Sequence, residues 1–345
     1  QANQTAQNSI IIAFFMALIN FLFIYFLGKD ALILQGINLE VLNLALEYFY
    51  VMAYGSLFMI FGIFLRAILI GEGESLIPMS ALGIGTIVNI ILDPFFIDYW
   101  SIAGAAYATI VSQVLSVLVM SFFIIIRKTT YIDLSFSNFK LDFKIWKKIL
   151  KIGIPSSISM LIMSIGLFIM NSILIDDAHV AGYNLANRIE NFITLTLISI
   201  STSQVTILGM FYGAKRYDLL KSMVRYTTLW SIIISIFFSI SSFFYIDDIA
   251  PFFLTATTAD EIEMSKKAIL STINYFRVMV FIYPFIAITM VSTRAMQAIG
   301  KAWPMMIVAF LRVILLQCTL SYIFITILDK EIIWAWYAIG ISCSF

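Results

Sequence analysis

The sequence predicts an all-α protein that crosses a lipid bilayer many times. Hydrophobic residues fill 61% of the 345 positions, charged residues fill only 12%, and the mean hydropathy is +0.99. A soluble globular domain averages about 45–50% apolar and about 25% charged residues. The apolar stretches are continuous rather than alternating, which is typical of packed membrane helices and not of barrel strands.

Apolar runs long enough to cross about 30 Å of hydrocarbon recur along the chain. They cover residues 10–27, 46–70, 76–97, 102–126, 152–175, 180–213, 222–246, 268–293 and 302–328, and a tenth covers 332–345. About ten helices are therefore expected.

The distribution of Lys and Arg predicts the orientation of these helices. Segment 127–151 holds seven cationic residues, and placing it in the cytoplasm makes the turns near 66–75, 214–225 and 294–301 cytoplasmic too. Fourteen cationic residues then lie inside and four outside, as the positive-inside rule requires. The same segment is the only long polar linker, and its mixed apolar and polar residues suggest that it lies along the membrane surface.

The sequence on the two sides of this linker repeats in order. Tyr48 and its neighbours return at Tyr275, Arg66-Ala67 returns at Arg294, and Ala105 returns at Ala335. An even number of helices separates the copies, so they are parallel repeats about an axis along the membrane normal.

The repeat predicts the domain boundaries. We expect an N-terminal lobe at 1–126, a cytoplasmic inter-lobe linker at 127–151 and a C-terminal lobe at 152–345. The first two helices of the C-terminal lobe lack counterparts in the N-terminal lobe, so about 80 residues are expected before Gln1. The same repeat offset leads us to expect about 9 further residues of the last helix after Phe345. The intact protein is then expected to have two six-helix lobes.

One polar pair interrupts the apolar run between Pro78 and Pro94. Asn89 and Asp93 are four residues apart, so they share a helix face. A carboxylate near a bilayer centre costs about 2.5–3.5 kcal/mol on insertion scales, and it is tolerated where it faces a cavity, a partner or a cation. The alternative is that Asp93 is solvated at the membrane surface, which Asp98 marks five residues later.

Oxygen atoms of the next helix complete a candidate cation site. Thr109 and Ala105 are one turn apart, and they offer a hydroxyl and a carbonyl oxygen beside the carboxylate of Asp93. Such oxygen ligands with one carboxylate suit a small hard cation such as Na⁺, or a proton that replaces it. Tyr48, which opens an earlier helix, faces either a cavity or lipid.

The remaining charged residues leave alternatives open. Arg188 and Glu190 are either a surface pair, which we favour, or the charged lining of the second lobe, whereas Arg277 and Arg312 either reach the membrane interfaces or face the interior. The single histidine, His179, argues against a His-ligated metal, and no nucleophile set or phosphate loop is present. The net charge of +1 gives no reason to expect nucleic acid as a partner. We expect neither an enzyme nor a bound cofactor.

In combination, the motifs resemble those of the multidrug and toxic compound extrusion (MATE) family. They are Arg66-Ala67, Gly73, Pro78-Met79, the run from Asn89 to Pro94 and Gly104–Thr109 in the first half, and Gly153-Ile154-Pro155, Val180–Tyr183, Asn187-Arg188-Ile189 and Gly213–Arg216 in the second. The resemblance covers essentially the whole chain. It implies a monomeric antiporter of the cytoplasmic membrane that exports drugs and organic cations against H⁺ or Na⁺. It also implies that Asn89 and Asp93 bind the coupling ion, with Ala105 and Thr109 adjacent and Tyr48 lining the lobe.

The chain departs from the family pattern in two ways. The family's first-helix aspartate would precede Gln1, and the acidic residue that some members carry on their seventh helix is not found in 152–175. The alternative is a flippase for lipid-linked oligosaccharides or peptidoglycan precursors, which needs more cationic residues toward the cavity than Arg188, Arg277 and Arg312. A multi-pass membrane enzyme fits less well because no nucleophile set supports it, and a structural membrane protein fits less well because it has little use for a membrane-buried Asn/Asp pair.

Overall fold

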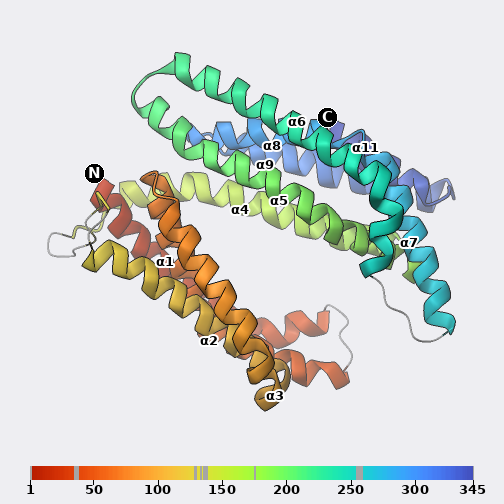
Figure 1. Cartoon of the computed structure of the whole chain (residues 1–345), viewed down its shortest axis with the longest axis horizontal. Helices are drawn as coiled ribbons and strands as arrows, with labels where there is room; N and C mark the ends of the chain where they lie inside the picture. The colour runs from red at the N-terminus through yellow and green to blue at the C-terminus, as the bar shows by residue number, and fades with distance from the viewer. Residues whose placement is uncertain are drawn as a thin grey trace. The chain divides into compact units, whose positions relative to one another are not determined.

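The structure is a computed structural model, and all of its regular elements are helices (Figure 1). It describes residues 2–34, 39–127, 130–132, 134, 139–174, 176–253 and 259–344. Within these residues no β-strand occurs, which confirms the predicted fold class. Parts of the predicted linker (128–129, 133 and 135–138) lie outside the described residues, as do the predicted helix ends at 175 and 345.

The chain forms two compact units, Gln1–Ile149 and Leu150–Phe345. The first contains α1 (Ala2–Leu34), α2 (Leu39–Gly71), α3 (Leu76–Ser121), the short π-helix η1 (Phe122–Ile126) and the beginning of α4 (Phe143–Ile173). Helix α2 packs against both α1 and α3 (Figure 1). We call the two units the first and the second lobe and describe each by itself.

Helix α3 consists of two antiparallel arms. Ser101 has a non-helical backbone with φ 53° and ψ −135°, a conformation that residues other than glycine rarely adopt. The hydroxyl of Ser116 on the second arm donates to the carbonyl of Ala81 on the first at 3.0 Å. The two arms correspond to the separate spans predicted at 76–97 and 102–126.

A buried amide joins α1 to the chain that leads into α4. Asn8 has no exposed surface, and its Nδ2 donates to the carbonyls of Gln4 at 2.8 Å and Lys140 at 3.1 Å. Its Oδ1 accepts from the backbone N–H of Asp142 and from Nε1 of Trp146 at 2.9 Å. The hydrogen-bonding capacity of this side chain is therefore filled, and it fixes the start of α4 on the first lobe.

The second lobe contains the rest of α4 and ten further helical segments among the described residues, some of which follow one another directly. They are α5 (Asp177–Gly213), α6 (Tyr217–Ile249) with η3 (Ala250–Phe253), α7 (Ala259–Met279), α8 (Tyr283–Ala298), the mixed helix α9 (Trp303–Ala309), η4 (Phe310–Cys318), α10 (Thr319–Tyr322) and η5 (Ile323–Ile327), and α11 (Ile333–Ser344). Helix α6 packs on α5 and α8. Small buried side chains recur along it (Ser231, Ser235, Ser239 and Ser242), which lets the helix backbones approach closely.

Two predicted elements differ from the structure. The run predicted as one continuous helix at 268–293 is broken in the structure: α7 ends at Met279, and α8 begins at Tyr283 at an angle of 67°. The reason is Pro284 in the first turn of α8, which lacks an N–H and cannot continue a preceding helix. Helix α4 begins at Phe143 instead of 152, so it includes the end of the segment predicted as a linker.

The helices are long and apolar enough for a membrane. Within the described residues seven helices qualify, and the bent pair α7–α8 brings the number to as many as eight. Large apolar side chains remain exposed along them, among them Phe26, Ile90, Phe168, Phe237 and Phe244. Such side chains are stable against lipid but costly in water, so the structure is that of a multi-pass membrane protein.

Candidate functional site

The predicted polar pair of the first lobe meets in the structure. Nδ2 of Asn89 donates to Oδ1 of Asp93 at 3.3 Å, as their four-residue spacing on one helix arm predicts. Both side chains are half-buried. The neighbouring residues Ile87, Ile90 and Ile91 are exposed, apolar and suited to lipid. The carboxylate thus lies in an apolar segment with one amide donor beside it.

The other predicted ligands of this site form a separate contact. Oγ1 of Thr109 donates to the carbonyl oxygen of Ala105 at 2.9 Å on the second arm of α3. Tyr48 is half-buried on α2. In the part of the chain that the structure describes, no direct hydrogen bond joins Thr109 or Tyr48 to Asp93. A cation ligated by all of them is therefore still a prediction.

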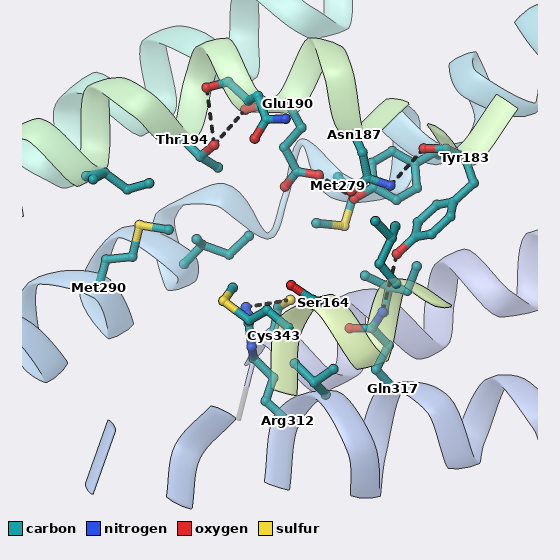
Figure 2. Close-up of a pocket in the computed structure, with 18 residues that line it drawn as sticks. Ser164, Tyr183, Asn187, Glu190, Thr194, Met279, Met290, Arg312, Gln317 and Cys343 are labelled. Atoms are coloured by element: carbon teal, nitrogen blue, oxygen red, sulfur yellow. Dashed lines mark hydrogen bonds between the residues drawn. The ribbon is translucent and has the colours of Figure 1, made fainter. Parts of the chain in front are cut away.

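The second lobe encloses a cavity of about 380 Å³. Helices α4, α5, α7, α8 and α11 and the π-helix η4 contribute its walls. The lining combines apolar side chains, among them Met163, Met279 and Met290, with amides, tyrosines, one acid and one guanidinium (Figure 2). A mainly apolar cavity with a few convergent polar groups is the usual form of a small-molecule site.

Glu190 is the only acidic residue among the described side chains that line this cavity. Its Oε2 accepts a hydrogen bond of 2.6 Å from the hydroxyl of Tyr275 on α7. The Tyr275 ring packs at 5.4 Å from Trp336 and 6.1 Å from Tyr183, both buried in the core of this lobe. The ring contacts hold the side chain of Tyr275 in place, and its hydroxyl therefore orients the carboxylate of Glu190.

Arg312 enters the cavity from the wall opposite Glu190 (Figure 2). Its Nη1 donates to Sγ of Cys343 at 3.4 Å, a weak acceptor. Arg312 lies in the π-helix η4, where hydrogen bonds join residues five apart. Arg312 and Gln317 therefore lie on one face of η4, whereas in an α-helix they would point to different faces. Short π-helical segments often occur at functional sites. The structure therefore places Arg312 in the interior, one of the two positions that the sequence left open.

The structure separates Arg188 from Glu190. Residues two apart on a helix point to different faces, so the surface pair that we favoured does not form, and spacing alone was enough to exclude it. Arg188 is exposed and is not among the residues that line the cavity. Arg277 is also exposed and lies 3.7 Å from Asp247 in an ion pair. Of the arginines Arg188, Arg277 and Arg312, Arg312 lines the cavity within the second lobe.

Sequence reasoning missed the roles of two residues that shape this site. Tyr275 was recognised only as the repeat partner of Tyr48, and Gln317 was not singled out. Gln317 Nε2 lies 3.5 Å from the hydroxyl of Tyr183, 134 residues earlier in the chain. Contacts at such a separation depend on the packing of the helices, and no local pattern predicts them.

Comparison with known proteins agrees with the architecture. A sequence profile of the family described as MatE matches residues 1–95 and 155–323. The chain is 24% identical over 306 residues to a protein named probable multidrug resistance protein NorM from Thermotoga maritima, covering 86% of this chain and 63% of that protein. It is 27% identical over 210 residues to the probable multidrug resistance protein YoeA of Bacillus subtilis, covering 57% of this chain and 44% of that one. The chain thus spans about half the length of these curated relatives.

Solved structures match over almost the whole chain. A MOP superfamily transporter from Pyrococcus furiosus, described by the reverse polarity of its binding pocket, superposes with a TM-score of 0.93 at 25% identity. A MATE family transporter in an outward-facing conformation gives 0.91 at 25% identity. Each match covers 99% of this chain and 75% of the other.

Proposed function

Because the chain belongs to the MatE family, whose members are transporters and not enzymes, we propose that it exports drugs and organic cations in exchange for H⁺ or Na⁺. The proposed location is the cytoplasmic membrane, and the proposed mechanism is alternating access by a monomer. The names of the curated relatives support multidrug export as the activity.

The observation that carries the coupling proposal is the Asn89–Asp93 pair. A carboxylate in an apolar span is costly, and binding a proton or Na⁺ removes most of that cost. An ion can drive a conformational change only if it binds one conformation more tightly than the other. An aspartate whose surroundings change between two conformations satisfies this condition, and Asn89 orients it in both because its amide can donate or accept.

The cavity of the second lobe supports the proposed substrate class. A cation entering it meets Glu190 and the rings of Tyr183 and Tyr275, which attract positive charge. The methionines of the lining are flexible and polarisable, so they adapt to compounds of different shape. Loose specificity of this kind is expected of a multidrug exporter.

Vesicles that contain the purified full-length protein test this function. An imposed gradient of H⁺ or Na⁺ should move a cationic dye across the membrane. An ionophore that collapses the gradient driving the dye should stop this movement. Comparing the two gradients identifies the coupling ion. Dye movement that ignores both gradients would contradict antiport, and absence of movement would contradict export.

A further inference from the structure

A second, smaller chamber of about 170 Å³ adjoins the cavity of the second lobe. The two share five lining residues, Met163, Ile198, Ile286, Met290 and Arg312. Arg312 therefore borders both spaces. The charged residues that line the smaller chamber are Arg294 and Arg312, and no acidic side chain lines it among the described residues.

Among the described residues, the hydrogen-bond partners of the two guanidinium groups are neutral. Nη1 of Arg294 donates to Oε1 of Gln297 at 2.9 Å, and Gln297 in turn donates to Ser156 at 3.2 Å. Arg312 donates to the weak acceptor Sγ of Cys343. Across the described residues, neither arginine forms an ion pair with an Asp or Glu side chain. Each guanidinium has five N–H donors, so both retain donors for a further ligand.

The hydroxyl groups that line the chamber do not compete with the two arginines as hydrogen-bond donors to a ligand. Those of Ser159, Ser201, Thr289 and Thr293 already donate to backbone carbonyls of their own helices. Four methionines make up much of the remaining wall (Met160, Met163, Met290 and Met305). A ligand therefore meets two guanidinium groups and a soft apolar surface.

The charges of this region are unbalanced. Arginine stays protonated in proteins, so Arg294 and Arg312 remain cationic, and two like charges on one small apolar chamber repel each other. Glu190, on the far wall of the larger cavity, offsets one of them at most. Two positive charges and one negative charge leave a formal charge of +1 for the joined spaces. A bound ligand with one negative charge would bring the formal charge of the joined spaces to zero.

We propose that this chamber binds the acidic group of an organic anion between Arg294 and Arg312, with the apolar part of the ligand against the methionines. The planar fork of arginine suits carboxylate, sulfonate or phosphate groups, which accept two parallel hydrogen bonds. The role of this site in transport rests on the proposed function. It extends the proposed substrates of the second lobe from cations to acids and to compounds that carry both charges.

Binding of 1-naphthoate to the purified full-length protein tests the site without any transport step. The neutral 1-naphthalenemethanol and the cationic 1-naphthalenemethylamine share its ring system and isolate the effect of charge. Naphthoate should bind more tightly than either. Arg294→Gln and Arg312→Gln should each weaken it about tenfold or more, because each removes a charge-assisted contact. Arg294→Lys should fall between, since it keeps the charge but loses the fork.

Two further variants sharpen the test. Glu190→Gln should tighten naphthoate binding because it removes the opposing negative charge, which a merely destabilising change would not do. Arg277→Gln should leave binding unchanged, since that arginine is exposed and paired with Asp247 outside the chamber. Equal affinity for the three naphthyl compounds, or naphthoate binding that ignores both Arg→Gln variants, would overturn the proposal, even in a protein that exports dye normally.

An anionic lipid headgroup has the same chemistry as a free acid, and a membrane comparison distinguishes them. Nanodiscs of phosphatidylcholine are compared with nanodiscs that also contain phosphatidylglycerol. Loss of naphthoate binding in the second identifies a headgroup as the occupant, and retention identifies a free acid. Either result requires a site for anions.

Discussion

Replacing Asp93 with asparagine is expected to reduce ion-driven export of a cationic dye to background while dye binding survives. The substitution keeps the size of the side chain and an oxygen that can accept from Nδ2 of Asn89, which lies 3.3 Å from the carboxylate in the structure. It removes the group that exchanges a proton or binds a cation. Without a difference in ion affinity between conformations, a gradient cannot bias the transport cycle.

The matched control for this variant is Asp98→Asn. Asp98 lies on the same arm of α3, five residues later, and its side chain is exposed near the turn at Ser101. Export by this control should remain close to the wild-type rate. If Asp93→Asn also exported dye at the wild-type rate under an imposed gradient, Asp93 would not couple transport, and Glu190 would be the next residue to change.

The Gly104→Ala substitution is expected to destabilise the first lobe strongly. Gly104 is buried just after the reversal of α3, and an added Cβ would fall on the carbonyl group of Phe96 and 2.7 Å from the backbone nitrogen of Ile97. These are backbone atoms of the opposing arm, so no side-chain rotation relieves the overlap. Overpacking of a tight contact costs about 1–3 kcal/mol, and a rigid backbone neighbour places this site at the upper end.

Gly83→Ala is the internal comparison for this prediction. Gly83 lies on the other arm of α3, and an added Cβ there meets no atom within 4 Å. In a helix interior, alanine is favoured over glycine by about 1 kcal/mol, so this variant should be neutral or stabilising. Thermal unfolding of the two purified variants measures the difference. An unfolding temperature of Gly104→Ala equal to or above that of Gly83→Ala would show that the two arms do not pack as described.

The sequence predicted the helical class and the main elements because these depend on local composition. The reversal between residues 97 and 102 was predictable, since Asp98 and Tyr99 interrupt two apolar runs. The bend between α7 and α8 also had a local signal in Pro284, but the continuous apolar run from 268 to 293 obscured it. The π-helix η4 had no signal, because its wider turn depends on packing within the second lobe.

The candidate sites were predictable to different degrees, because contacts within one helix follow from local spacing and contacts between helices depend on packing. Asn89 and Asp93 are neighbours on one helix, so their contact follows from spacing. Glu190 was named from the sequence, but its hydrogen bond to Tyr275 joins residues 85 positions apart and needed the folded lobe. Arg294 was identified as a cytoplasmic cation and as the repeat partner of Arg66, and its place in the same chamber as Arg312 depends on how α8 and η4 pack.

The most direct measurement of coupled export is ion movement driven by the substrate alone. Vesicles containing the full-length protein are prepared without any ion gradient, with radioactive sodium or a pH indicator inside and out. A cationic dye is then added to one side. If export is antiport, flow of the dye should drive Na⁺ or H⁺ in the opposite direction, and Asp93→Asn should abolish this movement. Dye that crosses the membrane through the wild-type protein without moving either ion would contradict coupled antiport.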